Sequence, residues 1–96
     1  MRKVKSRSLN IMGKTYRLIY KPLRDADGIY TYGISHHAKE KIEINARSSK
    51  CQQKATLLHE IIHCISGETG LRLKESQIST IASALYDTLK RNGLKL

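Results

Sequence analysis

The chain has no long apolar segment and only two cysteines, and each scarcity excludes a class of protein. No stretch of its 96 residues is apolar over the roughly 20 positions needed to cross a bilayer. Three of the first five residues are basic, and no apolar signal-peptide segment follows them. Cys51 and Cys64 lie thirteen positions apart in a segment expected to be helical, a rise of about 20 Å that is too long for a disulfide. We therefore expect a cytoplasmic protein with free thiols and no membrane contact.

Acidic residues are absent from the first quarter of the chain. Residues 1–24 contain eight Lys or Arg and no Asp or Glu, whereas residues 25–96 contain ten basic and eight acidic residues. This asymmetry produces most of the formal net charge of +10. A basic region of this kind can hold a nucleic acid or an acidic protein partner. No nucleic-acid-binding motif accompanies the charge, so a solvated surface is the simpler interpretation.

The length predicts one domain over residues 1–96, because no repeat, low-complexity stretch or linker divides it. Residues 1–9 form a basic segment that could be flexible. A domain of this size buries a limited core, so a bound metal ion would add useful stability. Nothing in the pattern specifies an oligomeric state.

Three segments of the first half are expected to be strands. Residues 10–21 alternate loosely between apolar and polar positions, which predicts one or two strands that end before Pro22. Residues 28–36 are rich in strand formers, and residues 41–45 alternate with a period of two. We predict that these segments form a small antiparallel three-stranded sheet.

The apolar period lengthens to three and four residues after position 49, which predicts two helices. Ser49 and Gln52 form a capping box at the start of the first helix, and Gly67 is a natural stop. The second helix is expected from about residue 75 to residue 92. Its predicted apolar stripe comprises Ile78, Ile81, Ala82, Leu85 and Leu89. The predicted fold is α+β, with the sheet packed on two helices.

Residues 59–63 read HEIIH, the HExxH pattern of zinc metallopeptidases. Positions four apart lie on one face of a helix, so His59 and His63 can both turn an imidazole nitrogen toward one zinc ion. Glu60 follows the first of these ligands directly. In this motif it is the general base that activates the water molecule.

A catalytic zinc ion usually has three protein ligands and one open position. We predict Glu75 as the third ligand, because it opens the second helix on the same face as Ile78 and Ala82, turned toward the first helix. An unpaired carboxylate on an apolar face would be costly. The alternative role for Glu75 is to favour the helix dipole in the first turn. Glu68, in the expected connection, is a competing ligand, but it lies only five residues after His63, which leaves little chain to fold back with good geometry.

Three segments together resemble the small zinc metallopeptidases of phages and prophages related to the ImmA and IrrE proteins. They read TLLHEIIH at 56–63, LKESQI at 73–78 and ALYDTL at 84–89, and the resemblance covers roughly residues 10–92. These proteins are minimal gluzincins, so the resemblance implies a zincin-like fold and zinc bound by His59, His63 and Glu75. Lys74 departs from the pattern, since a capping Ser, Thr or Asp is expected there. The resemblance implies a peptidase and leaves the substrate open.

The first functional hypothesis is a zinc-dependent endopeptidase that cleaves a cytoplasmic protein through a zinc-activated water molecule, with Glu60 as the general base. Such an enzyme also needs a group that stabilises the oxyanion. Tyr86 lies too far along the second helix from Glu75, at roughly 16 Å, and is expected to pack in the core. The remaining candidates, none of which is assigned, are Tyr30, Tyr32, His36 and His37.

The alternative hypothesis is a non-catalytic, zinc-stabilised binding module whose basic amino-terminal region holds a nucleic acid or an acidic protein. A third hypothesis combines the two, in that the chain resembles the SprT-like proteases, which cleave proteins on DNA. The basic segment suits this third hypothesis, whereas the short interval between His63 and Glu75 suits it less.

Overall fold

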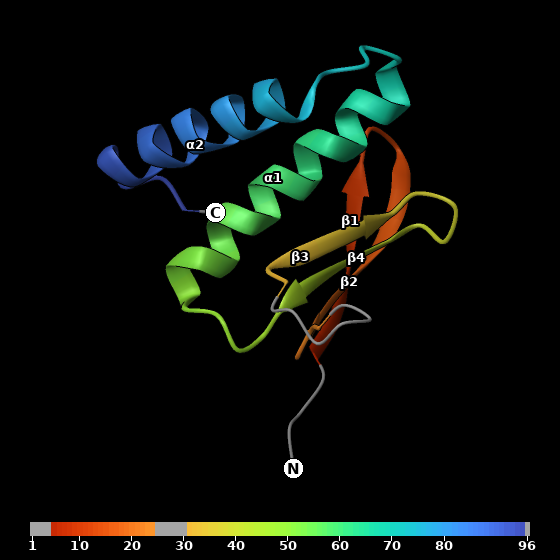
Figure 1. Cartoon of the computed structure of the whole chain (residues 1–96), viewed down its shortest axis with the longest axis horizontal. Helices are drawn as coiled ribbons and strands as arrows, with labels where there is room; N and C mark the ends of the chain where they lie inside the picture. Colours follow the sequence, from red (N-terminus) through yellow and green to blue (C-terminus); the bar gives the residue numbers. More distant parts are fainter. Residues whose placement is uncertain (1–4, 25–30, 96) are drawn as a thin grey trace.

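The computed structural model describes residues 5–24 and 31–95, and in these ranges six elements follow one another along the chain. They are β1 (Lys5–Ile11), β2 (Lys14–Lys21), β3 (Gly33–His36), β4 (Lys41–Asn45), α1 (Lys50–Thr69) and α2 (Glu75–Arg91). The four strands form one sheet in the order β1-β2-β4-β3. Both helices lie on the same side of this sheet, with α1 against the strands and α2 against α1 (Figure 1).

The α+β class is confirmed, but the prediction of three antiparallel strands is wrong. Residues 10–21 contain a hairpin, because Met12 and Gly13 adopt positive φ angles of 53° and 86° and turn the chain between β1 and β2. The sheet is mixed: β1–β2 and β3–β4 pair antiparallel, while β2 and β4 pair parallel. Alternation indicates which face of a strand is buried, but it does not indicate which strand pairs with it or in which direction.

The sheet side of the core is built from one face of β2 and β4. Leu18, Ile42 and Ile44 are fully buried there, and they form a cluster with Leu57 and Cys64 of α1. Leu18 and Ile42 are direct partners across the parallel pair, so their side chains stand on the same face. The register therefore fixes α1 over the centre of the sheet.

The first helix extends beyond its predicted stop. It continues through Gly67 and ends at Gly70, whose φ of 73° is the left-handed conformation common after helices. A Cβ atom added at Gly67 would lie 3.2 Å from Cε1 of His37. The glycine at position 67 therefore gives room to the His37 ring and does not terminate the helix.

The second helix begins at Glu75, as predicted, although its N-cap residue is Lys74. The backbone N–H of Lys74 donates to Oε1 of Gln77 at 2.8 Å, so the Gln77 side chain satisfies one of the free donors at this end. The predicted apolar stripe is only partly buried. Ile78 and Ala82 pack against α1, whereas Ile81 and Leu85 remain 44% and 40% exposed. Because α2 packs only on α1, one narrow side of it is covered.

Several other expectations concern the chain as a whole. No helix among the described residues is long and apolar enough to cross a membrane. Cys51 is exposed, Cys64 is buried, and both are free. Residues 5–9 of the basic segment belong to β1, whereas residues 1–4 lie outside the described residues, as do 25–30 and 96.

Gly33 allows β3 to approach α1 closely, and replacing it with Ala is expected to destabilise the fold. An added Cβ would lie 2.5 Å from Cγ2 of Thr56 and 3.1 Å from the carbonyl oxygen of Glu43. Overpacking of this kind costs about 1–3 kcal/mol, which denaturant unfolding would measure. Ser35→Ala, on the same strand, is the control and should change the stability by less than about 0.5 kcal/mol. An unchanged midpoint for Gly33→Ala would contradict this packing.

Candidate metal centre

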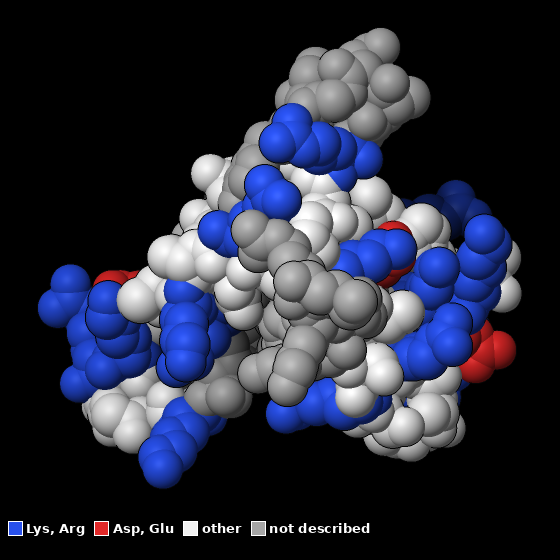
Figure 2. All heavy atoms as spheres, turned by 90° about the horizontal axis from the view of Figure 1, so that it is seen from below, with Lys and Arg blue, Asp and Glu red and all other residues white. Residues whose placement is uncertain are grey.

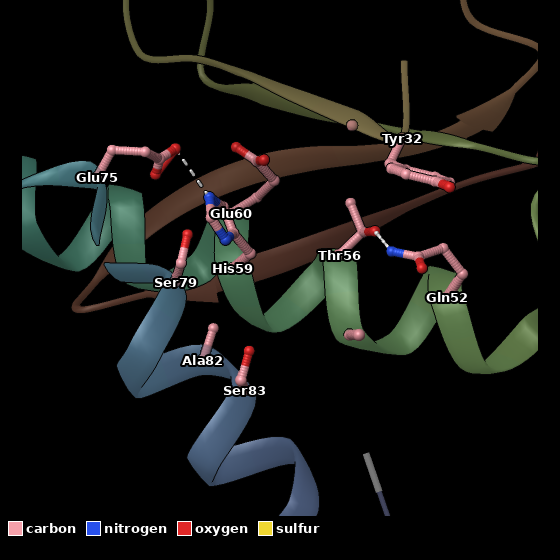
Figure 3. A pocket seen from close by; sticks show the side chains of 11 residues that line it. Tyr32, Gln52, Thr56, His59, Glu60, Glu75, Ser79, Ala82 and Ser83 are labelled. Atoms are coloured by element: carbon pink, nitrogen blue, oxygen red, sulfur yellow. Dashed lines mark hydrogen bonds and ion pairs between the residues drawn. The ribbon is translucent and has the colours of Figure 1, made fainter. Parts of the chain in front are cut away.

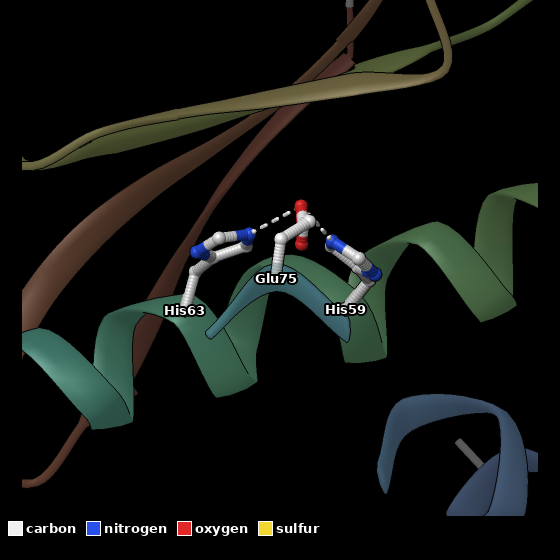
Figure 4. Close-up of side chains that lie close together, drawn as sticks. All are labelled: His59, His63 and Glu75. Atoms are coloured by element: carbon white, nitrogen blue, oxygen red, sulfur yellow. Dashed lines mark hydrogen bonds and ion pairs between the residues drawn. The ribbon is translucent and has the colours of Figure 1, made fainter. Parts of the chain in front are cut away.

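Three predicted ligands converge where the start of α2 meets the middle of α1. The Nε2 atoms of His59 and His63 each lie 3.1 Å from Oε1 of Glu75, and the three ligand atoms all lie within 4.8 Å of one another. Figure 4 shows the two imidazoles rising from successive turns of α1 and the Glu75 carboxylate placed between them. These three residues could hold a metal ion, and we call them the ligand group.

Local contacts bring Glu75 to this position. The chain leaves α1 through Gly70 and then Arg72, which has a positive φ of 55°. The backbone N–H of Leu73 donates to Oγ of Ser66, a buried residue of α1, at 2.9 Å. This bond ties the connection back onto the last turns of α1, so that the first residue of α2 lies beside His59 and His63.

The surroundings of Glu75 favour its charged form. Burial tends to raise the pKa of this carboxyl, but the contacts with His63 and His59 outweigh it, and the pKa is lower than usual. The N-terminal position in α2 also favours a negative charge. The side chain is 64% exposed, while those of His59 and His63 are 25% and 30% exposed. The group therefore faces solvent on one side.

The donor atoms fit a small divalent ion. Zinc binds His nitrogen and carboxylate oxygen at about 2.0–2.2 Å, so two ligands of a tetrahedral ion lie about 3.4 Å apart. The observed separation of each imidazole nitrogen from the carboxylate oxygen is 3.1 Å. The three atoms lie within 4.8 Å of one another, so small movements of the two imidazoles and of the Glu75 carboxylate would bring them to the separations that the ion requires.

Glu60 lies outside the group of His59, His63 and Glu75. Its side chain is buried, with the residue only 7% exposed, yet it lines a groove that His59 and Glu75 also line. Figure 3 shows it beside His59, extending from α1 toward the strands. A carboxylate in this place can accept a proton from a molecule bound next to the ligand group.

The groove has a volume of about 400 Å³ and runs along α1 between β3 and α2 (Figure 3). Tyr32 and Gly33 lie on its β3 side. Its α2 side is formed by small side chains, those of Ser79, Ala82 and Ser83, and α1 contributes Gln52, Ala55 and Thr56. Tyr32 was a candidate for oxyanion stabilisation and Ala82 was placed on the Glu75 face, but the sequence-based reasoning missed the other residues of the lining. The signal for them was the spacing of small residues on the same side of α2 as Glu75.

Asn45 holds the β3 side of the groove. It is fully buried, and its backbone N–H donates to the carbonyl oxygen of Tyr32 at 2.8 Å. Its side-chain nitrogen donates to the carbonyl oxygens of Thr31 at 2.7 Å and Leu23 at 3.2 Å. One buried amide thereby links β4 to the segment that enters β3.

Glu68 lies in the last turn of α1, and its predicted place in the connection is wrong. Its Oε1 pairs with Nζ of Lys14 at 3.0 Å and accepts from the hydroxyl of Tyr16 at 3.2 Å. The Lys14 contact is the main cause that lowers the pKa of this carboxyl. Glu68 therefore joins α1 to β2 and stays outside the ligand group.

The structure separates the candidates for oxyanion stabilisation. Tyr32 lines the groove, whereas Nε2 of His36 lies 2.8 Å from Oε1 of Glu43 on β4. The His37 ring lies against Gly67, a residue of α1 that is one helical turn beyond His63. Tyr86 packs on the cluster between the helices, as expected. Tyr30 lies outside the described residues.

Glu75→Ala is expected to weaken zinc binding at least about tenfold, because it removes one of three protein ligands. Glu68→Ala is the matched control. It also removes a glutamate carboxylate, but one in the last turn of α1 that pairs with Lys14 and lies outside the group of His59, His63 and Glu75. Competition against a zinc indicator would give both dissociation constants. A larger loss for Glu68→Ala than for Glu75→Ala would show that the ligand set is wrong.

Comparison with known proteins gives no match, whether with family models, curated proteins or solved structures. The function must therefore be argued from the residues of this site.

Proposed function

We propose that the protein is a zinc-dependent endopeptidase that cleaves a cytoplasmic protein. The observation that carries this proposal is the convergence of His59, His63 and Glu75 within 4.8 Å, next to a groove that contains the buried carboxylate of Glu60. The HExxH motif, followed by a glutamate at the start of the next helix, matches the ligand pattern expected of small gluzincins.

The choice of zinc rests on the donors. Two imidazole nitrogens and one carboxylate oxygen are a common set in catalytic zinc sites, whereas Mg²⁺ and Ca²⁺ prefer oxygen donors alone. When bound, zinc supplies Lewis-acid chemistry, because it polarises a carbonyl group and lowers the pKa of water. The exposed side chain of Glu75 leaves one side of the group open to solvent, from which a substrate could reach a bound ion.

Glu60 is suited to move the proton. Hydrolysis needs a base that removes a proton from the attacking water and an acid that returns it to the leaving amine. The Glu60 carboxylate performs both steps in this proposal, with an oxygen that faces the groove beside His59. Burial limits its contact with bulk water, which strengthens its interaction with a reacting group.

The edge of the sheet suits a peptide substrate. β3 pairs with β4 on one side and is the last strand in the sheet order, so its other side can accept an extended chain by backbone hydrogen bonding. Tyr32 and Gly33, at the start of this strand, line the groove. A peptide laid along β3 would therefore pass over Glu60 and the ligand group.

A proteome-wide cleavage screen would test the proposal. A host-cell extract would be incubated with zinc-loaded protein, and new amino termini would be identified by mass spectrometry. We expect a defined set of new termini that disappears when zinc is removed by a chelator and returns when zinc is restored. The same termini with and without the metal would contradict a zinc peptidase.

A further inference from the structure

The sheet has a second face, turned away from both helices, that is rich in cations. We call it the outer sheet face. Its side chains follow from the strand register, which places alternate residues on one side. They are Ser6, Ser8 and Asn10 of β1, Thr15, Arg17, Ile19 and Lys21 of β2, Lys41, Glu43 and Asn45 of β4, and Ile34 and His36 of β3. Among the described residues visible from below, Lys and Arg side chains greatly outnumber acidic ones (Figure 2).

Two cations on this face stand directly opposite each other. Arg17 and Lys41 are partners in the parallel β2–β4 register, where neighbouring strands are about 4.8 Å apart. Like charges at such positions destabilise a sheet. Arg17 is exposed, and no carboxylate of the described residues forms an ion pair with it. An anion bound between these two side chains would relieve their repulsion.

Among the strand residues that the structure describes, Glu43 is the only acidic residue of the outer sheet face, and it is already neutralised. It is 5% exposed, and its carboxylate lies 2.7 Å from Nζ of Lys21 and 2.8 Å from Nε2 of His36. Lys41 is more distant, at 3.9 Å. Lys21 and Lys41 therefore share one carboxylate, and with Arg17 the face carries a net charge of +2 before any contribution from His36.

We propose that the outer sheet face binds the phosphate backbone of duplex DNA, with Arg17 and Lys41 as the central contacts. This interaction goes beyond the proposed peptidase activity and uses the opposite side of the sheet from the groove. DNA and a peptide substrate could therefore be bound at the same time. The peptidase would then act on proteins that lie close to DNA.

The composition of the face favours a duplex. It has no Phe, Tyr or Trp side chain, and its one imidazole, that of His36, is paired with Glu43. Stacking on aromatic rings is the main source of affinity for unpaired bases. Duplex DNA carries one negative charge per about 1.7 Å of its axis, a dense row of anions that complements exposed cations. The formal net charge of +10 also accelerates association with such a polyanion.

Fluorescence anisotropy with a labelled DNA duplex of about 20 base pairs would test this inference, over about 50–200 mM salt. The test variant is Arg17→Gln with Lys41→Gln. The control is Lys90→Gln with Arg91→Gln, which removes the same charge from the exposed last turn of α2. We expect the test variant to bind at least about tenfold more weakly and to lose about 2 from the slope of log K against log salt, because each phosphate contact contributes about 0.9. The control should change the affinity less than about twofold.

The thermal stability of the same variants distinguishes lost contacts from misfolding. Because Arg17→Gln with Lys41→Gln removes a like-charge pair, its melting temperature should be equal to or higher than that of the wild type. Equal loss of DNA affinity in the two double variants would overturn the proposal, since net charge alone would then explain binding. Tighter binding to single-stranded DNA, duplex RNA or an acidic peptide would also overturn it, as would no binding to duplex DNA at the lowest salt.

Discussion

Replacing Glu60 with Gln is expected to abolish peptide-bond hydrolysis while leaving the metal and the fold in place. The amide has almost the same shape as the carboxylate but cannot accept the proton of the attacking water. A positioned general base contributes about 100- to 10,000-fold to the rate, so the cleavage rate should fall at least about 100-fold. Glu60 is not among the residues that can hold the metal, so zinc content should not change. Cleavage of a substrate identified by the proteome screen would give the rate, and elemental analysis the zinc content.

Glu68→Gln is the matched control for this substitution. It makes the same chemical change in the same helix, at a residue that pairs with Lys14 and lies outside the groove. Its activity should stay within about twofold of wild type, since surface substitutions rarely have larger effects. The non-catalytic binding module makes a different prediction, in which Glu60→Gln changes no measurable function. Full peptidase activity in Glu60→Gln would exclude Glu60 as the base, whereas cleavage by neither the wild type nor the variant would favour that alternative.

Replacing His59 and His63 together with Ala is expected to remove the zinc ion and to lower the melting temperature strongly. Binding free energy for the folded state adds directly to stability. At a free zinc concentration about 1,000 times the dissociation constant, this contribution is about 4 kcal/mol. For a domain of this size, each kcal/mol shifts the melting temperature by about 4–8 °C. We therefore expect a drop of at least about 15 °C, and a similar drop when the wild type is treated with a chelator.

His37→Ala controls for the loss of an imidazole near the site. The His37 ring lies against Gly67 and does not belong to the ligand group. Its replacement should leave one zinc ion per chain and a chelator-sensitive melting temperature. Full zinc occupancy in the double variant would contradict the assignment of both histidines. A chelator that leaves the wild-type melting temperature unchanged would contradict the coupling of metal and fold.

The ligand group could be predicted from the sequence because it depends mainly on helical periodicity. His59 and His63 are four positions apart on one helix, and their proximity follows from the helical repeat alone. Glu75 required one further assumption, that a short connection returns the chain to the same place. The structure supports that assumption through the bond from Leu73 to Ser66.

The sheet was less predictable, because strand order depends on contacts between distant residues. The alternation at residues 41–45 identified a strand and its buried face, yet β4 inserts between β2 and β3. The prediction that Gly67 ends the first helix was wrong for the same reason, since its role depends on a residue distant in sequence. Glycine is common at helix ends, whereas here its missing side chain accommodates the His37 ring from a distant turn. The residues next to Gly67 in the sequence do not predict that contact.

The most direct test of the central claim is a crystal structure of the protein purified with zinc, with anomalous diffraction recorded at the zinc absorption edge. We predict one strong peak per chain between α1 and the start of α2. Nε2 of His59, Nε2 of His63 and a carboxylate oxygen of Glu75 should each lie about 2.0–2.2 Å from it, while the Glu60 carboxylate should not coordinate the ion. No peak at this position, or coordination by Glu60 or Glu68 in place of Glu75, would contradict the account.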